Sequence, residues 1–370
     1  MKLNLGLIFG GRSGEHEVSL LSARSIANTV NRKKYNLFLI AVDKSGNWYL
    51  SDENDYLNHA DDPSAISLKV NSGQQVALIP DKNSNSLIRT SDGKKMVSLD
   101  VAFPIIHGTF GEDGSLQGYM AMLNIPCVGA DVLGSAVGMD KLVAKELLIR
   151  AGIPVAGYVL AEHDVNLDQT IQKAEAKLGY PVFVKPACSG SSVGVYKAND
   201  NNELKDDIKK ALRYDRRVLI EEAIQGREIE CAILGNEELI ASVPGEIIPQ
   251  HEFYSYEAKY IDSEGAQLDV PAKIPGEIVT RVQELAKKAY KIISCSGMAR
   301  VDMFLKQNGE LILNEINTLP GFTKISMYPK LMELTGMPYP ELIDRLIELA
   351  RKRHKQQEQF LQNVLKDKAY

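Results

Sequence analysis

One short stretch near the end of the chain combines residue types that could do chemistry. The sequence predicts a β-hairpin there, because two apolar runs, 301–305 and 311–313, flank the turn-like sequence Gln-Asn-Gly. Side chains alternate along a strand, so each strand would present its polar residues on one face. These residues are Arg300 and Asp302 on the first strand, and Glu315 and Asn317 on the second.

The hairpin would bring three oxygen donors close to one guanidinium. Asp302, Glu315 and Asn317 carry hard oxygen atoms, which magnesium prefers when it is shared with phosphate oxygens. Arg300 adds a planar positive fork suited to a phosphate or a developing oxyanion. Acids near a hairpin are often simply solvated, but the apolar neighbours of Glu315 make an isolated carboxylate costly there. The stretch therefore predicts a metal and nucleotide centre.

The composition is that of a globular protein. The 370 residues include 25% charged and 44% hydrophobic side chains, enough for two or three domains and unlike a disordered or fibrous chain. The net charge of -5 argues against a nucleic-acid partner without excluding an anionic ligand. The four cysteines form no CxxC pair, so neither a zinc site nor a disulfide framework is indicated, and a reducing cytoplasm is expected. No apolar run approaches the ~18 residues of a membrane span, and the first residues lead into a strand rather than a signal peptide.

Residues 1–139 predict an α/β domain with a Rossmann-like parallel sheet. Its opening apolar run ends in two glycines and precedes a helical pattern, so the turn would lie at the carboxyl end of a strand, where such sheets bind ligands. Glu15 lies in this turn, and His107, which could bind a substrate or cap a strand, begins a second glycine-rich turn. The fingerprint G-x-G-x-x-G is absent, which disfavours a dinucleotide. The polar stretch 44–95 is expected to be a surface elaboration.

Residues 140–222 predict a second domain, which begins with a helix. A strand at 181–186 carries Lys185, and the glycine- and serine-rich loop 189–194 separates it from another strand. A Walker A loop would open a helix instead, so this loop is interpreted as a flap over phosphates or as a plain hairpin loop. The strand 218–222 ends in two acids, which could accept hydrogen bonds from a nucleotide or face solvent.

Residues 223–370 predict a third domain that contains the opening hairpin and ends in a charged helical pattern. A long connection at 242–272 precedes the hairpin and shows little regular pattern. Such a connection is uncommon unless it is functional or disordered, and its aromatic residues favour an ordered lid.

Several motifs in this order resemble the ATP-grasp enzymes and, in detail, the D-alanine:D-alanine ligase family. The motifs are GGRSGEHEVSL, HGTFGEDGSLQG, GMDKLVAKELL, VFVKPACSGSSVGV, LIEE, YEAKY, MARVDMF and LNEINTLPGFT. The resemblance covers nearly all of the chain up to about residue 350. It implies a three-domain α/β (α+β) ATP-grasp fold, with ATP held between the two α+β subdomains that follow the N-terminal domain.

The resemblance also implies roles for individual residues. A nucleotide site would comprise Lys141, Lys185, Ser191, Ser192, Glu221 and, on the ribose, Glu228. Two Mg²⁺ (or Mn²⁺) ions would be held by Asp302, Glu315 and Asn317. The two D-alanine subsites would use Glu15, His107, Lys259 and Ser326. The catalytic set would be Glu15, Ser191, Tyr260, Arg300, Ser326 and the backbone NH of Gly321. Within this set, Ser191 of the flap and Tyr260 of the lid would both contact Glu15.

The activity implied by the resemblance is ATP-dependent joining of two D-alanine molecules through a D-alanyl phosphate, with release of ADP and phosphate, for peptidoglycan precursors. A D-alanine:D-lactate ligase is an alternative, disfavoured because those enzymes lack the tyrosine at the position of Tyr260. A second alternative is a regulator that binds a nucleotide without turnover. It is disfavoured because a complete set of metal ligands, Asp302, Glu315 and Asn317, lies beside Arg300. The expected partners are D-alanine, ATP and a second copy of the chain, in the cytoplasm, with neither nucleic acid nor membrane.

Overall fold

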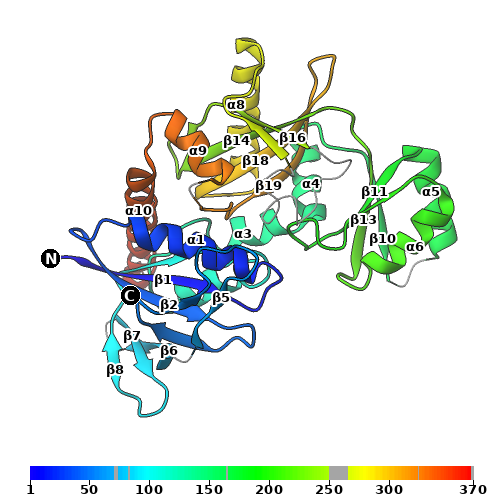
Figure 1. Cartoon of the computed structure of the whole chain (residues 1–370). Helices are drawn as coiled ribbons and strands as arrows, with labels where there is room; N and C mark the ends of the chain where they lie inside the picture. The colour runs from blue at the N-terminus through cyan, green and yellow to red at the C-terminus, as the bar shows by residue number, and fades with distance from the viewer. Residues whose placement is uncertain (71–73, 82–83, 164–165, 250–265, 324, 368–370) are drawn as a thin grey trace.

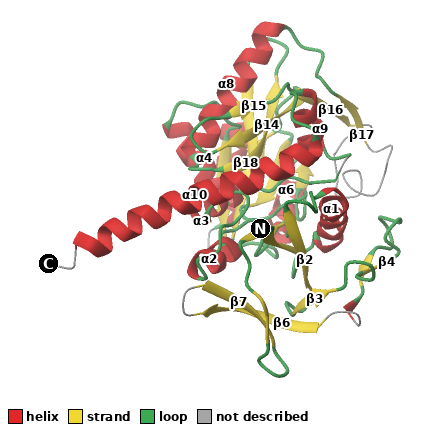
Figure 2. Ribbon diagram, turned by 90° about the vertical axis from the view of Figure 1, so that its left-hand side faces the viewer, coloured by secondary structure: helices red, strands yellow, loops and turns green. Residues whose placement is uncertain are grey.

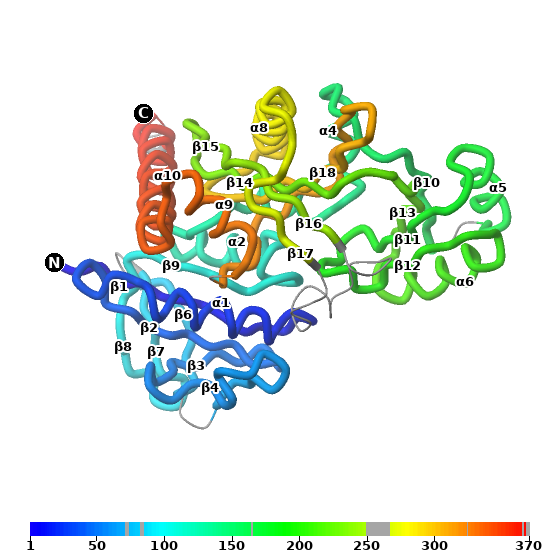
Figure 3. Tube along the Cα trace, turned by 45° about the horizontal axis from the view of Figure 1, so that its top comes forward, coloured from blue at the N-terminus to red at the C-terminus, as the bar shows by residue number. Residues whose placement is uncertain are grey.

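The computed structural model of the chain describes residues 1–70, 74–81, 84–163, 166–249, 266–323 and 325–367. Three sheets with their helices form three lobes around the centre of the molecule (Figure 1). Viewed from another direction, the four-stranded sheet lies apart from the seven-stranded one, with the six-stranded sheet between and above them (Figure 3). This mixture of sheets and helices confirms the predicted α/β (α+β) fold class.

The first sheet has seven strands in the order β8-β7-β6-β3-β2-β1-β9. Among its described strands, β2, β1 and β9 pair in parallel, as the strand-turn-helix opening predicts. The stretch 44–95, expected as a surface elaboration, adds the antiparallel strands β3 and β6–β8. The strands are β1 (Leu3–Gly10), β2 (Tyr35–Val42), β3 (Trp48–Ser51), β6 (Gln74–Asp81), β7 (Ser84–Arg89), β8 (Lys95–Val97) and β9 (Val101–Pro104), with a separate ribbon of β4 (Leu57–Asn58) and β5 (Ser67–Leu68).

The described helices before residue 140 are α1 (His16–Thr29), α2 (Ser115–Met122) and α3 (Val132–Met139); α1 packs against β1, and α3 against α2 and β19. The turn before α1 needs glycine, because Gly10 has φ 89° and a Cβ there would lie 2.3 Å from the Val42 carbonyl oxygen. The sharp turn leaves Glu15 directly before the first residue of α1, at the carboxyl end of β1.

The central sheet is antiparallel, in the order β10-β13-β11-β12. Helices α5 and α6 pack against it, and each begins with a side-chain cap, Asn166 and Asp200 respectively. Helix α4, predicted to open this region, begins at Lys141, one residue after its cap Asp140. The elements are α4 (Lys141–Arg150), β10 (Tyr158–Glu162), α5 (Leu167–Leu178), β11 (Val182–Pro186), β12 (Tyr196–Ala198), α6 (Asn201–Ala211) and β13 (Arg217–Glu222).

The third sheet has the order β17-β16-β14-β18-β19, with β15 beside β14. The predicted hairpin is present as β18 and β19. The connection 242–272, expected to be irregular, instead contributes the paired strands β16 and β17 at its two ends. The elements are β14 (Arg227–Gly235), β15 (Ile240–Ala241), β16 (Gly245–Pro249), β17 (Ala266–Asp269), α8 (Gly276–Ile292), β18 (Gly297–Leu305), β19 (Leu311–Asn317) and α9 (Met327–Leu334).

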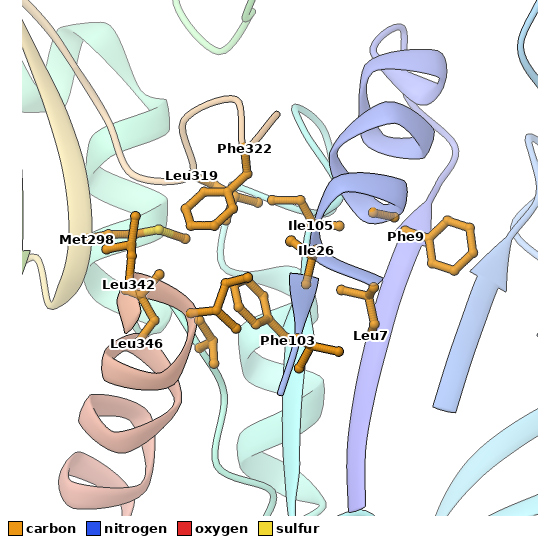
Figure 4. Close-up of a cluster of buried hydrophobic side chains, with 14 of the residues drawn as sticks. Leu7, Phe9, Ile26, Phe103, Ile105, Met298, Leu319, Phe322, Leu342 and Leu346 are labelled. Carbon is orange, nitrogen blue, oxygen red and sulfur yellow. The ribbon is translucent and has the colours of Figure 1, made fainter. Parts of the chain in front are cut away.

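A shared hydrophobic core joins the first sheet to the third. Figure 4 shows Phe103 of β9 beside Phe322 of the loop after β19, and their ring centroids are 5.9 Å apart. Helix α10 (Tyr339–Asp367) contributes Leu342 and Leu346 to the same core. Burial of so many apolar side chains fixes the turn of Glu15 relative to the loop that follows β19.

The far end of α10 extends away from the body of the molecule (Figure 2). Nearer the body, Arg353 of α10 donates hydrogen bonds to the carbonyl oxygens of Cys127 and Gly129, both at 2.7 Å. Among the helices in the described ranges, none is long and apolar enough to cross a bilayer.

Candidate active site

The hairpin places the predicted metal ligands opposite one another. Asp302 pairs with Glu315 across the two strands, and Arg300 pairs with Asn317. Directly opposed residues share a face of the sheet, so these four side chains lie on one side. Asp302 is 8% exposed, and the side-chain oxygen of Asn317 accepts the backbone NH of Leu319 at 3.0 Å.

This donor set fits magnesium better than a transition metal. Two carboxylates and one amide supply hard oxygen atoms and leave coordination positions for phosphate or water. In the described part of the chain, no group of three or more His, Cys, Asp or Glu side chains could hold a metal ion by itself. An open set of oxygen donors is what a metal shared with a nucleotide requires.

A β-bulge decides which way Glu315 points. The register shifts between Asp302 and Met303: Asp302 pairs with Glu315 but Met303 pairs with Leu313, which leaves Asn314 as the extra residue. Asp302 and Met303 point to opposite faces, so Glu315 and Leu313 do too. Leu313 is 1% exposed in the core, whereas simple alternation would have placed it on the same face as Glu315.

Arg300 bridges two carboxylates on neighbouring strands. Its guanidinium donates to Asp302 at 2.7 and 2.8 Å and lies 3.1 Å from Glu230. Burial alone would lower the pKa of Arg300, but the charges of Asp302 and Glu230 hold it well above its ordinary value. The sequence interpretation missed Glu230, although its alternation with Glu228 along β14 was a usable signal. Pairing of β14 with β18 places Glu230 directly opposite Asp302.

A second charged cluster lies on the central sheet. Glu221 of β13 accepts a hydrogen bond from Lys185 of β11 at 2.8 Å and lies 3.1 Å from the ammonium of Lys145 in α4. Burial would raise the pKa of Glu221, but Lys185 and Lys145 outweigh it and lower the pKa to about 2. The sequence interpretation missed Lys145, which lies in the GMDKLVAKELL motif four residues after Lys141.

The two clusters meet between the sheets. Lys185 lies 3.4 Å from the side-chain oxygen of Asn314, the extra residue in the bulge of β19. Burial opposes the charge of Lys185, but Glu221, Glu315 and Glu228 together raise its pKa. The structure therefore brings the predicted nucleotide residues Lys185, Glu221 and Glu228 into one electrostatic environment with the predicted metal ligand Glu315.

The flap closes on the turn of the first sheet. The hydroxyl of Ser191 donates a hydrogen bond to the carboxylate of Glu15, which is 8% exposed. That carboxylate fits closely against glycine backbones, since a Cβ on Gly190 would lie 2.9 Å from its oxygen. At the base of the flap, the Lys141 ammonium donates to the Ser189 carbonyl oxygen. Ser192, the other predicted flap residue, has φ 60°, a backbone conformation more usual for glycine.

His107 links the first sheet to the loop after β19. One ring nitrogen, Nδ1, lies 3.0 Å from the Leu319 carbonyl oxygen, and the other, Nε2, lies 3.1 Å from the Ser22 hydroxyl. A carbonyl can only accept, so Nδ1 carries a proton. Burial would lower the pKa of His107, but Glu112 and Glu15 raise it above its ordinary value. The predicted contact of His107 with a substrate stays a prediction beside these protein contacts.

Of the remaining predicted residues, two are described by the structure and two are not. Ser326 lies beside Gly321: a Cβ on Gly321 would be 3.1 Å from its hydroxyl oxygen. That hydroxyl also accepts the Thr323 NH at 3.1 Å. Lys259 and Tyr260, assigned to the lid, lie outside the described residues.

The central and C-terminal sheets, with lysines on one and carboxylate and amide oxygen donors on the other, define the chain as an ATP-grasp enzyme. Two family models match it: "D-ala D-ala ligase N-terminus" over residues 4–130 and "D-ala D-ala ligase C-terminus" over residues 147–348. A D-alanine–D-alanine ligase from Oceanobacillus iheyensis is 51% identical over 365 residues, covering 97% of this chain and 98% of that protein. The chain belongs to the D-alanine–D-alanine ligase family.

Solved structures agree with this assignment. The D-alanine–D-alanine ligase from Coxiella burnetii superposes with a TM-score of 0.87 at 37% identity, covering 100% of this chain and 99% of that one. The VanG D-Ala:D-Ser ligase from Enterococcus faecalis superposes with a TM-score of 0.83 at 36% identity, covering 95% and 100%. The overall arrangement of all three lobes is therefore shared with ligases of this family.

Proposed function

We propose that the chain joins two D-alanine molecules into D-alanyl-D-alanine, using ATP, for the synthesis of peptidoglycan precursors. The observation that carries the proposal is the meeting of two opposite charge clusters, where Lys185 approaches the bulge of β19 at 3.4 Å. A nucleotide between the two sheets would have ammonium groups on one side of its phosphates and oxygen donors for metal ions on the other. Family membership supports the same activity.

The first half of the reaction sets two anions against each other. The carboxylate of the first D-alanine attacks the γ-phosphate of ATP, forming a D-alanyl phosphate and releasing ADP. Lys141 and Lys185 would bind the phosphates, Ser191 and Ser192 would cover them, Glu221 would accept from the adenine amine, and Glu228 would bind the ribose. Asp302, Glu315 and Asn317 would hold two Mg²⁺ or Mn²⁺ ions, whose positive charge would offset the repulsion.

The second half forms the peptide bond. The amine of the second D-alanine attacks the acyl carbon, and phosphate then leaves. Arg300 and the NH of Gly321 would stabilise the tetrahedral oxyanion, while Ser326 and Lys259 would bind the second carboxylate. Glu15 and His107 would orient the first D-alanine. Contact between Ser191 and Glu15 would hold the flap closed and, together with Tyr260 of the lid, would exclude water that could hydrolyse the acyl phosphate.

Three further expectations belong to this proposal. The chain would be organised as domains 1–139, 140–222 and 223–370, each built around one of the three sheets. It would act in the cytoplasm, where free cysteines persist and ATP is available. It would form a homodimer, which sedimentation of the purified chain measures directly.

Phosphate release tests the activity. The chain is incubated with Mg-ATP and D-alanine, D-alanine plus D-lactate, D-alanine plus D-serine, or no amino acid. Release that depends on D-alanine alone is expected, with D-alanyl-D-alanine as product. Release only with D-lactate or D-serine would assign a different second substrate, and nucleotide binding without release would assign a regulator. Chelation of divalent ions should abolish turnover, and Mg²⁺ or Mn²⁺ should restore it.

A further inference from the structure

Lys145 is a buried ammonium group that the reaction described above does not use. Its side chain is 3% exposed, and its ammonium lies 3.1 Å from one carboxylate oxygen of Glu221. Within the described residues, neither of these two atoms has a well-aligned hydrogen-bond partner, so their contact is mainly electrostatic. A buried lysine is costly unless its charge is compensated, which makes this position informative.

The two lysines beside Glu221 differ in their solvent exposure and in their other contacts. Lys185 is 17% exposed at the side chain, contacts the other carboxylate oxygen and also reaches Asn314 on the opposite sheet. Lys145, on the buried face of α4, is only 3% exposed at the side chain, and its contact is with the carboxylate oxygen of Glu221 that Lys185 does not touch. An incoming triphosphate would therefore attract Lys185 and leave Lys145 where it is.

Helix α4 carries both Lys145 and a lysine that contacts the flap. Lys141 and Lys145 are four residues apart and lie on the same face of α4. Lys141 donates to the Ser189 carbonyl at the base of the flap, while Lys145 faces Glu221. One helix thus holds both the flap and the carboxylate expected to meet the nucleotide base.

We propose that Lys145 is the permanent counter-ion of Glu221: it keeps this carboxylate ionised and oriented toward the adenine amine after Lys185 moves to the phosphates. The inference rests on the proposed function, because it assigns a positioning residue to the same nucleotide site. Without Lys145, Glu221 would either retain Lys185 and compete with the phosphates, or take up a proton and lose its acceptor for the adenine amine. Both outcomes weaken nucleotide binding.

Base selectivity follows from the same argument. Adenine presents an amine at C6, which an ionised Glu221 accepts, whereas guanine presents a carbonyl oxygen there, which an ionised Glu221 repels. A protonated Glu221 would donate to that carbonyl instead. Loss of Lys145 should therefore reduce the preference for ATP over GTP, an effect that a purely structural defect would not produce.

Calorimetric binding of ADP, which involves no turnover, tests the role of Lys145. Lys145→Met should raise the Kd for ADP by about tenfold or more and narrow the ratio of kcat/KM for ATP over GTP. The KM for D-alanine at saturating ATP should change little. Lys145→Arg, which keeps the charge, should recover most of the ADP affinity. Lys209→Met, which removes an exposed lysine on α6, is the matched control and should bind ADP as the unaltered chain does.

A double-mutant cycle separates action through Glu221 from a general defect. In a Glu221→Gln background, Lys145→Met should have little further effect on ADP binding. Additive effects, or an unchanged ADP Kd and ATP/GTP ratio in Lys145→Met, would overturn the proposal.

A structure of the unaltered chain with ADP or ATP gives a test that needs no variant. Lys145 should remain beside Glu221 while the Lys185 ammonium moves onto a phosphate; the reverse would overturn the proposal. Failure of the proposed function is distinguishable, because it would appear as absence of D-alanine-dependent phosphate release in the unaltered chain, whatever ADP binding shows.

Discussion

On the central sheet, one carboxylate lies between two ammonium groups, whereas on the C-terminal sheet one guanidinium lies between two carboxylates. Glu221 is 2.8 Å from Lys185 and 3.1 Å from Lys145. Arg300 is 2.7 Å from Asp302 and 3.1 Å from Glu230. The first arrangement carries surplus positive charge and suits phosphates, while the second carries surplus negative charge and suits metal cations.

The two arrangements also differ in how far they can be predicted from the sequence. On the C-terminal sheet, Asp302 and Glu315 belong to one hairpin, so local alternation is enough to group them, and only Glu230 comes from another strand, β14. The lysines around Glu221 come from a helix and a different strand, 76 and 36 residues away in sequence respectively. Only folding brings those three side chains together.

Removal of one negative charge from the C-terminal sheet should have the largest effect on activity. Glu315→Gln keeps the shape but weakens a predicted metal ligand, so we expect turnover to fall by roughly 10³-fold with the fold intact. Phosphate release and circular dichroism measure the two outcomes. Glu310→Gln changes a half-buried acid near the turn of the same hairpin, paired with Lys306, and is the control. Unchanged turnover in Glu315→Gln would remove this residue from the metal site.

Replacement of the guanidinium should have the next largest effect. Arg300→Lys keeps the charge but cannot donate two parallel hydrogen bonds to Asp302 while reaching Glu230. We expect kcat to fall by about 10²-fold, because the expected oxyanion donor loses its fixed geometry. Steady-state kinetics at saturating substrates measure it. Arg345→Lys, on the exposed face of α10, should leave kcat unchanged; an equal loss in both variants would contradict the assigned role of Arg300.

The charge balance around Glu221 predicts a dependence of stability on pH. The pKa of Glu221 is lowered from 4.5 to about 2 in the folded chain. A carboxylate with a depressed folded pKa stabilises above its unfolded pKa, and that contribution is lost as the pH falls from 4.5 toward 2. The contribution is at most about 3 kcal/mol.

Glu221→Gln removes this titration. The difference in unfolding free energy between the unaltered chain and Glu221→Gln should therefore shrink as the pH falls from about 5 to 3. Urea unfolding at several pH values measures it. Glu284→Gln, in an exposed position of α8, is the control. A difference that stays constant over this range would show that the two lysines do not depress the pKa of Glu221.

The smallest effect is expected at the contact between the flap and Glu15. Ser191→Ala removes the hydrogen bond to Glu15, so we expect kcat/KM for D-alanine to fall by about tenfold as flap closure weakens. Cys188→Ala, in the exposed part of the same loop, should leave this parameter unchanged. Equal behaviour of the two variants would mean that the contact between Ser191 and Glu15 does not contribute to closure.

Several features of the fold were predictable because their signals are local. The hairpin of β18 and β19, the glycine turn before α1 and the strand carrying Lys185 follow from apolar periodicity and turn residues. The ends β16 and β17 of the connection 242–272 were not predicted, because their stability comes from pairing with strands distant in sequence.

The sequence by itself determined which side chains are available: oxygen donors on a hairpin, lysines and serines in an ordered set of motifs, and a core pattern for three sheets. Tertiary structure alone decided that Asn314 forms a bulge that separates the directions of Leu313 and Glu315, that Glu230 faces Arg300, and that Lys145 is buried against Glu221. The physical reason is that strand register and burial depend on partners far away in the chain, whereas residue type and periodicity are local.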